Sequence, residues 1–287
     1  MGADIQIKKL GLIAGNGRFP FLVLQEAIAQ GIPVVVAAIK EETSKDIDRF
    51  AGSAPPVEVH WLGLGQLGRL LKLFRESGVD KAIMAGQVKH NRIFSRDTSL
   101  SRIVTTLPDF KMLQLLLSLP SKNTEALIGG IATTLEKEGI ELLDSTSLLG
   151  RAVARLGVLT SRAPNEQELR DIAYGRQIAR EIARLDIGQT VVIKDQAVVA
   201  VEAMEGTDET IRRAALLADR KALTVVKVSR PRQDMRFDVP VIGGQTLKTL
   251  EECHVTALSI DADKTLIFDR DEFIAAANRL KIAIVAE

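Results

Sequence analysis

Short apolar runs separated by glycine turns and amphipathic stretches dominate the first half of the chain. The first run is short and ends at Ala14, and a Gly-Asn-Gly turn and a stretch with helical spacing from about Pro20 to Gly31 follow it. Residues 33–39 form the second run. A strand, a glycine turn, a helix and a strand in this order make a βαβ unit, which favours a parallel sheet covered by helices. We therefore predict an α/β fold at the start of the chain.

The same alternation continues beyond this unit. We predict further strands over 57–62, 81–85 and 140–143 and helices over 67–77, over 112–119 and from residue 123 or 124 to about 139. Apolar residues are nearly continuous from Met112 to Leu119, up to the helix-breaking Pro120. This run fits either a helix buried in the core or a helix in contact with acyl chains.

The polar, glycine-containing residues 144–150 are the best candidate for a domain boundary. Beyond them, hairpins replace crossovers, because residues 190–194 and 197–201 flank the two-residue turn Asp195-Gln196. The other elements expected here are helices over 165–184, after 205–208 and over 271–279, and strands over 222–228, 256–260, 265–268 and 282–285. The second half is therefore predicted to be α+β with a mixed sheet.

Residues 227–244, KVSRPRQDMRFDVPVIGG, combine charge with the alternation of a strand. In an extended chain Asp234, Arg236 and Asp238 would point one way and the apolar side chains between them the other. At about 3.3 Å per residue the two aspartates would lie roughly 13 Å apart, too far to share one metal ion. Either the segment bends or the two carboxylates have different roles. The alternative is an edge strand with a solvated ion-pair face.

Composition and charge exclude several classes of protein. The 38 Lys and Arg residues nearly balance the 37 Asp and Glu residues, so no global basic field indicates nucleic-acid binding. The single cysteine, Cys253, cannot form an internal disulfide, and no basic segment followed by a long apolar run begins the chain. We expect a cytosolic protein. The apolar runs are shorter than the roughly 20 residues that span a bilayer, which leaves contact with a membrane surface open.

Two glycine arrays have spacings typical of nucleotide-binding loops. Gly15, Asn16 and Gly17 lie between a predicted strand and a predicted helix, but Pro20 occupies the third position of a dinucleotide fingerprint. The run GLGQLG from Gly63 has the spacing, but no acidic residue stands at the end of a following strand about 20 positions on. A nicotinamide or flavin cofactor is therefore disfavoured. Backbone amides at the Gly15 turn could hold a phosphate, and the alternative is a tight structural turn.

The loop after the strand over 81–85 contains three basic or potentially basic side chains, Lys89, His90 and Arg92. Loops at the carboxyl ends of parallel strands are where such sheets bind ligands. These side chains either face a phosphorylated ligand or belong to a solvated loop.

The run EAMEGTD, which begins at Glu202, leads from a predicted strand into a predicted helix. A purely structural interpretation makes Thr207 the N-cap and places Asp208 at the positive end of the helix dipole. In a functional interpretation, Gly206 allows close backbone approach and Thr207 holds a phosphate. Glu202, Glu205 and Asp208 are then candidate ligands for Mg²⁺, which prefers oxygen.

Six motifs occur in order along essentially the whole chain. They are GLIAGNGRFP, AIMAGQVKH, RLDIGQTVVI, AVEAMEGTDETIRR, KVSRPRQDMRFDVPVIGG and IFDRDEFIAAA. With these motifs the chain resembles the UDP-2,3-diacylglucosamine pyrophosphatase family of lipid A biosynthesis, the type distinct from the calcineurin-like metallophosphoesterases. Lys89-His90-Asn91 stands where relatives often carry an arginine or a proline.

This resemblance implies an N-terminal Rossmann-like domain with a parallel sheet, over 1–148, and a distinct C-terminal catalytic domain, over 149–287, with the substrate between them. It implies hydrolysis of UDP-2,3-diacylglucosamine to UMP and 2,3-diacylglucosamine 1-phosphate, with water attacking the β-phosphorus and with Mg²⁺ or Mn²⁺ as cofactor. We expect a cytoplasmic protein that contacts the inner face of the inner membrane transiently. The resemblance leaves a homodimer open.

The resemblance also implies roles for individual residues. The family's catalytic aspartate corresponds to Asp238, and we expect Asp234 and Arg236 to act beside it. The expected metal ligands are Asp238, Asp208 and Glu205. The expected substrate-binding residues are Gly15, Asn16, Gly17, Lys89, Lys227, Arg230, Gln233, Gly206 and Thr207. Cations in this set would offset the charge of a pyrophosphate diester. A non-catalytic protein that binds a UDP-sugar or a lipid phosphate is the alternative.

Overall fold

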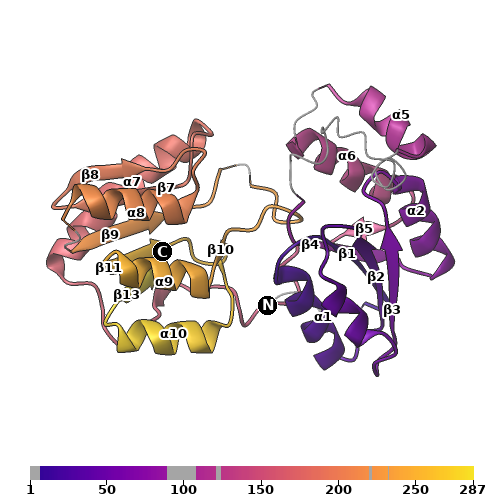
Figure 1. The fold of residues 1–287 in the computed structure, drawn as a ribbon, viewed down its shortest axis with the longest axis horizontal. Helices are drawn as coiled ribbons and strands as arrows, with labels where there is room; N and C mark the ends of the chain where they lie inside the picture. Colours follow the sequence, from indigo (N-terminus) through magenta and orange to yellow (C-terminus); the bar gives the residue numbers. More distant parts are fainter. Residues whose placement is uncertain (1–6, 89–107, 121–123, 220–221, 232) are drawn as a thin grey trace. The chain divides into compact units, whose positions relative to one another are not determined.

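The structure of the protein, a computed structural model, describes residues 7–88, 108–120, 124–219, 222–231 and 233–287 (Figure 1). It divides into two compact units, Met1–Leu149 (unit 1) and Gly150–Glu287 (unit 2). Each unit has its own sheet and its own hydrophobic core, and each is described by itself. Among the helices that the structure describes, none is long and apolar enough to cross a lipid bilayer.

Unit 1 contains a five-stranded parallel sheet with the order β3-β2-β1-β4-β5. Its strands are β1 (Leu10–Ala14), β2 (Val34–Ile39), β3 (Val57–Leu62), β4 (Lys81–Ala85) and β5 (Glu141–Leu142). Every residue of β1 and β2 is buried, as expected for parallel strands with both faces covered. The predicted parallel α/β sheet is therefore confirmed.

Helices cover both faces of this sheet. They are α1 (Phe19–Ala29), the 3₁₀ helix η1 (Lys45–Phe50), α2 (Leu67–Glu76), α5 (Phe110–Ser118) and α6 (Thr124–Lys137). The carboxylate of Asp109 caps α5 through the amide of Met112 at 2.9 Å and also accepts the Gly68 amide of α2 at 2.6 Å. One acidic side chain thus joins the starts of two helices.

Helix α5 buries only one of its faces. Met112 and Leu115 pack into the core, whereas Phe110, Leu113 and Leu117 are 79%, 46% and 79% exposed. Their spacing of three and four residues places these three side chains on one face of the helix. The interpretation as a core helix therefore holds for one face, and the other face exposes an apolar stripe.

Unit 2 contains a six-stranded mixed sheet with the order β6-β13-β11-β9-β7-β8. Its strands are β6 (Gly157–Val158), β7 (Thr190–Lys194), β8 (Ala197–Val201), β9 (Leu223–Lys227), β11 (Val255–Ile260) and β13 (Ala283–Ala286). The strands β9, β11 and β13 are parallel, whereas β7 is antiparallel to β8 and β9. Asp195 and Gln196 close the β7–β8 hairpin with φ values of 50° and 59°. The predicted mixed sheet is confirmed.

The helices of unit 2 lie on both faces of its sheet (Figure 1). They are α7 (Glu166–Arg184), α8 (Thr207–Leu217), α9 (Gly244–Glu252) and α10 (Arg270–Arg279). Helix α7 packs on β7 and β9, and Gly175 makes this contact close because a Cβ there would lie 2.8 Å from Val226. Ile211, Leu250 and Phe273, from the other three helices, share one core on the opposite face. A two-stranded parallel sheet of β10 (Val241–Ile242) and β12 (Leu266–Ile267) lies apart from the main sheet.

Candidate phosphate-binding pocket

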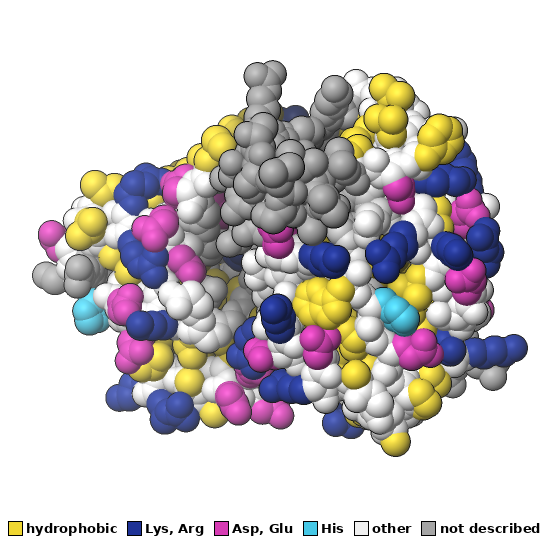
Figure 2. Space-filling view, turned by 45° about the vertical axis from the view of Figure 1, so that its right-hand side comes forward, with side chains coloured by type: hydrophobic (Ala, Val, Ile, Leu, Met, Phe, Trp, Pro, Cys, Tyr) yellow, Lys and Arg dark blue, Asp and Glu magenta, His cyan; other side chains and the backbone are white. Residues whose placement is uncertain are grey.

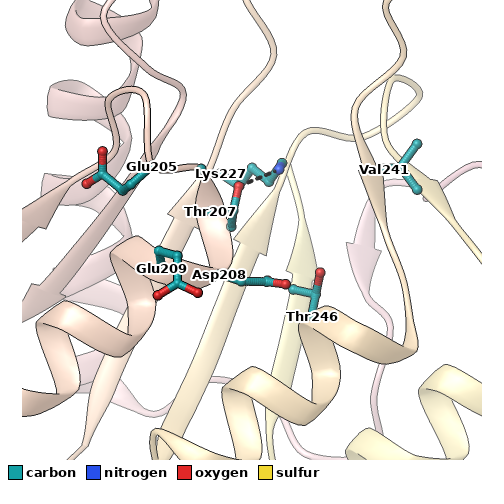
Figure 3. A pocket seen from close by; sticks show the side chains of 8 residues that line it. Glu205, Thr207, Asp208, Glu209, Lys227, Val241 and Thr246 are labelled. Carbon is teal, nitrogen blue, oxygen red and sulfur yellow. Dashed lines mark hydrogen bonds between the residues drawn. The ribbon is translucent and has the colours of Figure 1, made fainter. Parts of the chain in front are cut away.

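Unit 2 contains a pocket of about 320 Å³ where the loop after β8, the end of β9, β10 and the first turns of α8 and α9 meet (Figure 3). The residues that line it are Glu205, Gly206, Thr207, Asp208, Glu209, Lys227, Val241 and Thr246. Five of these, Glu205, Gly206, Thr207, Asp208 and Lys227, were candidate site residues on sequence grounds. Polar groups therefore outnumber apolar ones in its wall.

The starts of two helices contribute to this pocket. Gly206 is the N-cap of α8 with a φ of 84°, a conformation that suits glycine, and Gly243 is the N-cap of α9. Neither cap supplies a side-chain hydrogen bond, so the first amides of both helices are not satisfied by a capping side chain. Helix N-termini carry partial positive charge and favour anions. The prediction that Thr207 caps α8 is wrong, because Gly206 holds that position and Thr207 is already helical.

Lys227 places a cation in the wall of the pocket. Its side chain is buried, and Nζ donates a hydrogen bond to Oγ1 of Thr207 at 2.8 Å, as Figure 3 shows. Burial lowers the pKa of Lys227, and the nearby carboxylates of Glu202, Asp208 and Asp238 oppose this effect. The ammonium group therefore lies among three acidic side chains from three segments of unit 2.

Asp208 and Glu205 differ in their surroundings. Burial raises the pKa of Asp208 in spite of the neighbouring Arg212 and Lys227, and its side chain is directed toward Thr246 in Figure 3. A hydrogen bond from its own backbone amide and another from Arg213 lower the pKa of Glu205 to about 2. The Glu205 carboxylate accepts Nη2 of Arg213 at 2.8 Å and the Ala203 amide at 3.0 Å. Glu205 is thus engaged within its own loop and helix.

The structure gathers no metal-ligand set of three. In the part of the chain that it describes, no group of three or more His, Cys, Asp or Glu side chains could hold a metal ion. Of the three expected ligands, Asp208 and Glu205 line the pocket, and the negative charge of Asp238 opposes the lowering of the Lys227 pKa. Mg²⁺ often uses only one or two carboxylates together with water and substrate phosphates.

The segment between β9 and β10 is not the extended strand that its alternation predicts. The carbonyl of Asp234 accepts the amides of Phe237 at 3.1 Å and Asp238 at 2.8 Å, which closes a tight turn. The Asp234 carboxylate reinforces this turn by accepting the Arg236 amide at 3.0 Å. Such a local bond from an aspartate competes with strand pairing. The segment bends, and the spacing expected for two aspartates on a straight strand does not apply.

Charged side chains of this segment have separate partners. The Asp234 carboxylate pairs with Arg236, which lowers the pKa of Asp234. Nε of Arg230 lies 3.3 Å from Oδ1 of Asp186. Asp238 is half-buried, and among the described residues none donates a hydrogen bond to its carboxylate. Of these groups, Asp238 is the one whose charge acts on Lys227.

Gln233 stabilises the backbone at the start of this segment. Its side-chain Oε1 accepts the backbone amide of Arg230 at 2.8 Å, and its backbone amide donates to the carbonyl of Arg230 at 3.2 Å. The first of these bonds gives the side chain of Gln233 a structural role in this turn.

The glycine turn after β1 belongs to unit 1. The amide of Gly15 donates to the carbonyl of Ala85 at 2.8 Å, and the amide of Asn16 donates to the carbonyl of Gln87 at 2.7 Å. A Cβ on Gly86 would lie 2.5 Å from the carbonyl of Asn16, so the two loops approach closely. Two amides of the turn therefore bind backbone, while Gly17, with a φ of 92°, faces open space. Lys89 and the rest of its cationic loop lie outside the described residues.

Sequence reasoning missed Glu209, Val241 and Thr246 as pocket residues. Thr246 is in the first turn of α9, two residues after Gly244, and the preceding pair of glycines is the signal that marks this helix start. Val241 belongs to an apolar pair in β10, and nothing in the sequence distinguishes it from a core residue.

Comparisons with known proteins agree on one family. The profile of the LpxI N-terminal domain matches residues 9–152, and that of the LpxI C-terminal domain matches residues 155–285. The chain is also 30% identical over 286 residues to UDP-2,3-diacylglucosamine pyrophosphatase LpxI of Caulobacter vibrioides, with 97% of each protein covered. Two domain profiles in the correct order and a relative of nearly full length show that this chain belongs to the LpxI family.

Proposed function

We propose that this protein hydrolyses the pyrophosphate bond of UDP-2,3-diacylglucosamine in lipid A biosynthesis and releases UMP and 2,3-diacylglucosamine 1-phosphate. Membership of the LpxI family and the activity in the name of the Caulobacter relative support this proposal. The observation that carries it is the buried Lys227 ammonium in a pocket formed by two helix starts. A pyrophosphate diester has two negative charges, and such a wall offsets them.

In the proposed mechanism Lys227 and the first amides of α8 and α9 bind the phosphate oxygens. These groups are in place before the reaction, so they stabilise the charge that develops on the oxygens without reorganising. The carboxylate of Asp238 orients the water molecule that attacks the β-phosphorus. The same carboxylate accepts a proton from this water. Asp234 and Arg236 hold the turn that presents Asp238.

We further propose Mg²⁺ as cofactor, with Mn²⁺ as a substitute. Asp208 and Asp238 would hold the ion, because both are carboxylates near Lys227 and neither is held by an arginine the way Glu205 is. The raised pKa of Asp208 supports the fit, since burial disfavours its charged form and a bound cation would favour that form. When bound, the ion would offset charge on the pyrophosphate oxygens.

We also propose that α5 contacts the acyl chains of the substrate at the membrane surface. Phe110, Leu113 and Leu117 form the exposed apolar stripe of this helix. Figure 2 shows exposed hydrophobic side chains at the upper right, in the region where Figure 1 places α5. Burying three such side chains in lipid would contribute several kcal/mol, at about 1.5–3 kcal/mol each.

A direct assay tests the proposed function. Purified protein and Mg²⁺ are incubated with UDP-2,3-diacylglucosamine, and UMP and the lipid phosphate are detected by mass spectrometry. Stoichiometric release of both products supports the proposal. Binding of the intact substrate without turnover would favour a non-catalytic binding protein instead.

A further inference from the structure

The carboxylate of Glu202 is buried behind the pocket and does not line it. It follows directly on β8, and its Oε1 accepts the hydroxyl of Thr207 at 3.0 Å. Its Oε2 accepts the backbone amide of Gln189 at 3.2 Å. Both carboxylate oxygens are therefore occupied within the chain, which argues against the role of metal ligand that the sequence suggested for Glu202.

The hydroxyl of Thr207 connects Glu202 to Lys227. A hydroxyl has one hydrogen to donate, and Glu202, which is acceptor-only when ionised, receives it. The oxygen of Thr207 is then left with its lone pairs, and Nζ of Lys227, which can only donate, binds one of them at 2.8 Å. The 3.2 Å contact between the hydroxyls of Thr190 and Thr207 must run in the same sense, with Thr190 as donor. Glu202 thus fixes the direction of every hydrogen bond at Thr207.

We propose that Glu202 is a positioning residue, which holds the Lys227 ammonium at the pocket through the hydroxyl of Thr207. A lysine has a flexible four-carbon stem, so its charge is directed only where an acceptor holds it. Glu202 would not touch the bound ligand, and its effect on binding would depend on Lys227. The consequence for turnover rests on the proposed function, whereas the effect on phosphate binding does not.

The substitution Glu202→Gln tests this arrangement with little change in shape. The amide nitrogen of glutamine would have to face either the Thr207 hydroxyl or the Gln189 backbone amide, and both of these groups donate to Glu202 in the wild-type protein. A mismatch of this kind, together with loss of the charge, weakens a charge-assisted interaction by about 1.5–3 kcal/mol, which is about tenfold or more in affinity. We expect isothermal titration calorimetry with inorganic pyrophosphate to show a loss of this size.

A double-mutant cycle with Lys227→Gln separates positioning from a general structural effect. If Glu202 acts through Lys227, Glu202→Gln weakens pyrophosphate binding in the wild-type background and adds almost nothing in the Lys227→Gln background. Additive losses would overturn the inference. Absence of pyrophosphate binding by the wild-type protein would overturn it as well.

Asp171→Asn is the matched control. Asp171 is another buried carboxylate of unit 2, and it accepts a backbone amide, that of Gln196, at 2.7 Å. It lies on α7 and takes no part in the pocket lining. Its amide variant should retain the pyrophosphate affinity of the wild type, even at a lower melting temperature. A loss equal to that of Glu202→Gln would show that the effect is only structural.

Thr207 provides the test if Glu202→Gln does not fold. Thr207→Ser keeps the hydroxyl and should retain pyrophosphate affinity, whereas Thr207→Val keeps the shape, lacks the hydroxyl and should lose about tenfold or more. Equal affinities of the two variants would contradict the inference. UMP release by the wild-type protein is measured separately. If the double-mutant cycle gives the expected coupling between Glu202 and Lys227 but the wild-type protein releases no UMP, the proposed function is refuted and the role of Glu202 stands.

Discussion

The carboxylate of Asp234 binds the guanidinium of Arg236 through Nε at 3.0 Å and Nη2 at 2.7 Å, two residues along the chain. It also accepts the backbone amide of Arg236 at 3.0 Å. These bonds commit Asp234 to the turn, whereas Asp238, at the end of the same turn, has a carboxylate without a hydrogen-bond donor among the described residues. The two aspartates therefore differ in what their oxygens can still bind.

Asp238→Ala should remove turnover and leave folding almost unchanged. If Asp238 accepts the proton of the attacking water, its loss should lower kcat for UMP release by about 100-fold or more. The free energy of unfolding should change by less than about 1 kcal/mol, because no described group donates a hydrogen bond to this half-buried carboxylate. UMP release and thermal denaturation are measured on the same preparation. Near-normal turnover would show that another carboxylate orients the water.

Asp234→Ala should loosen the turn that presents Asp238. The variant loses the bonds to the amide and guanidinium of Arg236, so we expect faster cleavage of residues 229–240 by a protease and a larger rise in KM than fall in kcat. Asp234→Asn is the control, because its amide oxygen can still accept the Arg236 amide. An Asp234→Ala variant with an intact turn and no turnover would reverse the roles of the two aspartates.

Asp208→Asn should raise the Mg²⁺ concentration needed for half-maximal UMP release. The substitution removes a proposed ligand, and one lost carboxylate weakens the site by about tenfold or more. Glu205→Gln, in the loop just before α8, is the matched comparison, and its metal titration should stay that of the wild type, since Arg213 already binds this carboxylate. If Glu205→Gln shifted the titration as strongly as Asp208→Asn, Glu205 would have to be counted among the ligands.

Gly188→Ala should destabilise unit 2 and weaken pyrophosphate binding together. A Cβ on Gly188 would lie 2.0 Å from the carbonyl oxygen of Glu202, so the backbone that carries Glu202 must move. Overpacking of this kind costs about 1–3 kcal/mol of unfolding free energy. Gly150→Ala is the control, because the nearest atom to a Cβ there, on Arg155, is 4.0 Å away. Calorimetric unfolding and pyrophosphate titration of both variants give the comparison.

Acid should destabilise unit 2 partly through Glu168. Burial would raise the pKa of Glu168, but hydrogen bonds from Arg162 and from the Asn165 amide outweigh it and lower the pKa below the usual 4.5. A lowered pKa in the folded state gives stability that is present above the usual value and is lost as the pH falls below it. Glu168→Gln should therefore cost about 2 kcal/mol at pH 7 and less at pH 3, where protonation of Glu168 is favoured more in the unfolded chain than in the folded one. An equal cost at both values would contradict this assignment.

Much of the fold could be predicted from local pattern. The strands β1 and β2 were predictable because all their residues are buried, which leaves short apolar runs between glycine turns. The hairpin turn at Asp195 and Gln196 was predictable because two strand-like apolar runs flank these two residues and aspartate tolerates a positive φ. Each of these features depends on residues close together in the chain.

The segment 227–244 could not be predicted in the same way. Alternation predicts the directions of side chains only for an extended chain, and the bonds from Asp234 to the Arg236 amide and guanidinium bend this one. The pocket lining could be predicted only in part. Lys227 and Thr207 were recognisable as candidates, but Thr246 joins them only through the packing of α9 beside α8. That contact connects residues far apart in sequence, and periodicity carries no information about it.

The position of the pocket lining in the chain has a practical consequence for engineering. All of the lining residues lie between Glu205 and Thr246, a single continuous stretch that includes α8, β9 and the turn at Asp234. A chimera between two family members that exchanges this stretch would transfer the complete polar wall in one piece. Under the proposed function, phosphate binding and acyl-chain contact would then be varied independently, by exchanging this stretch in one set of chimeras and the apolar stripe of α5 in another.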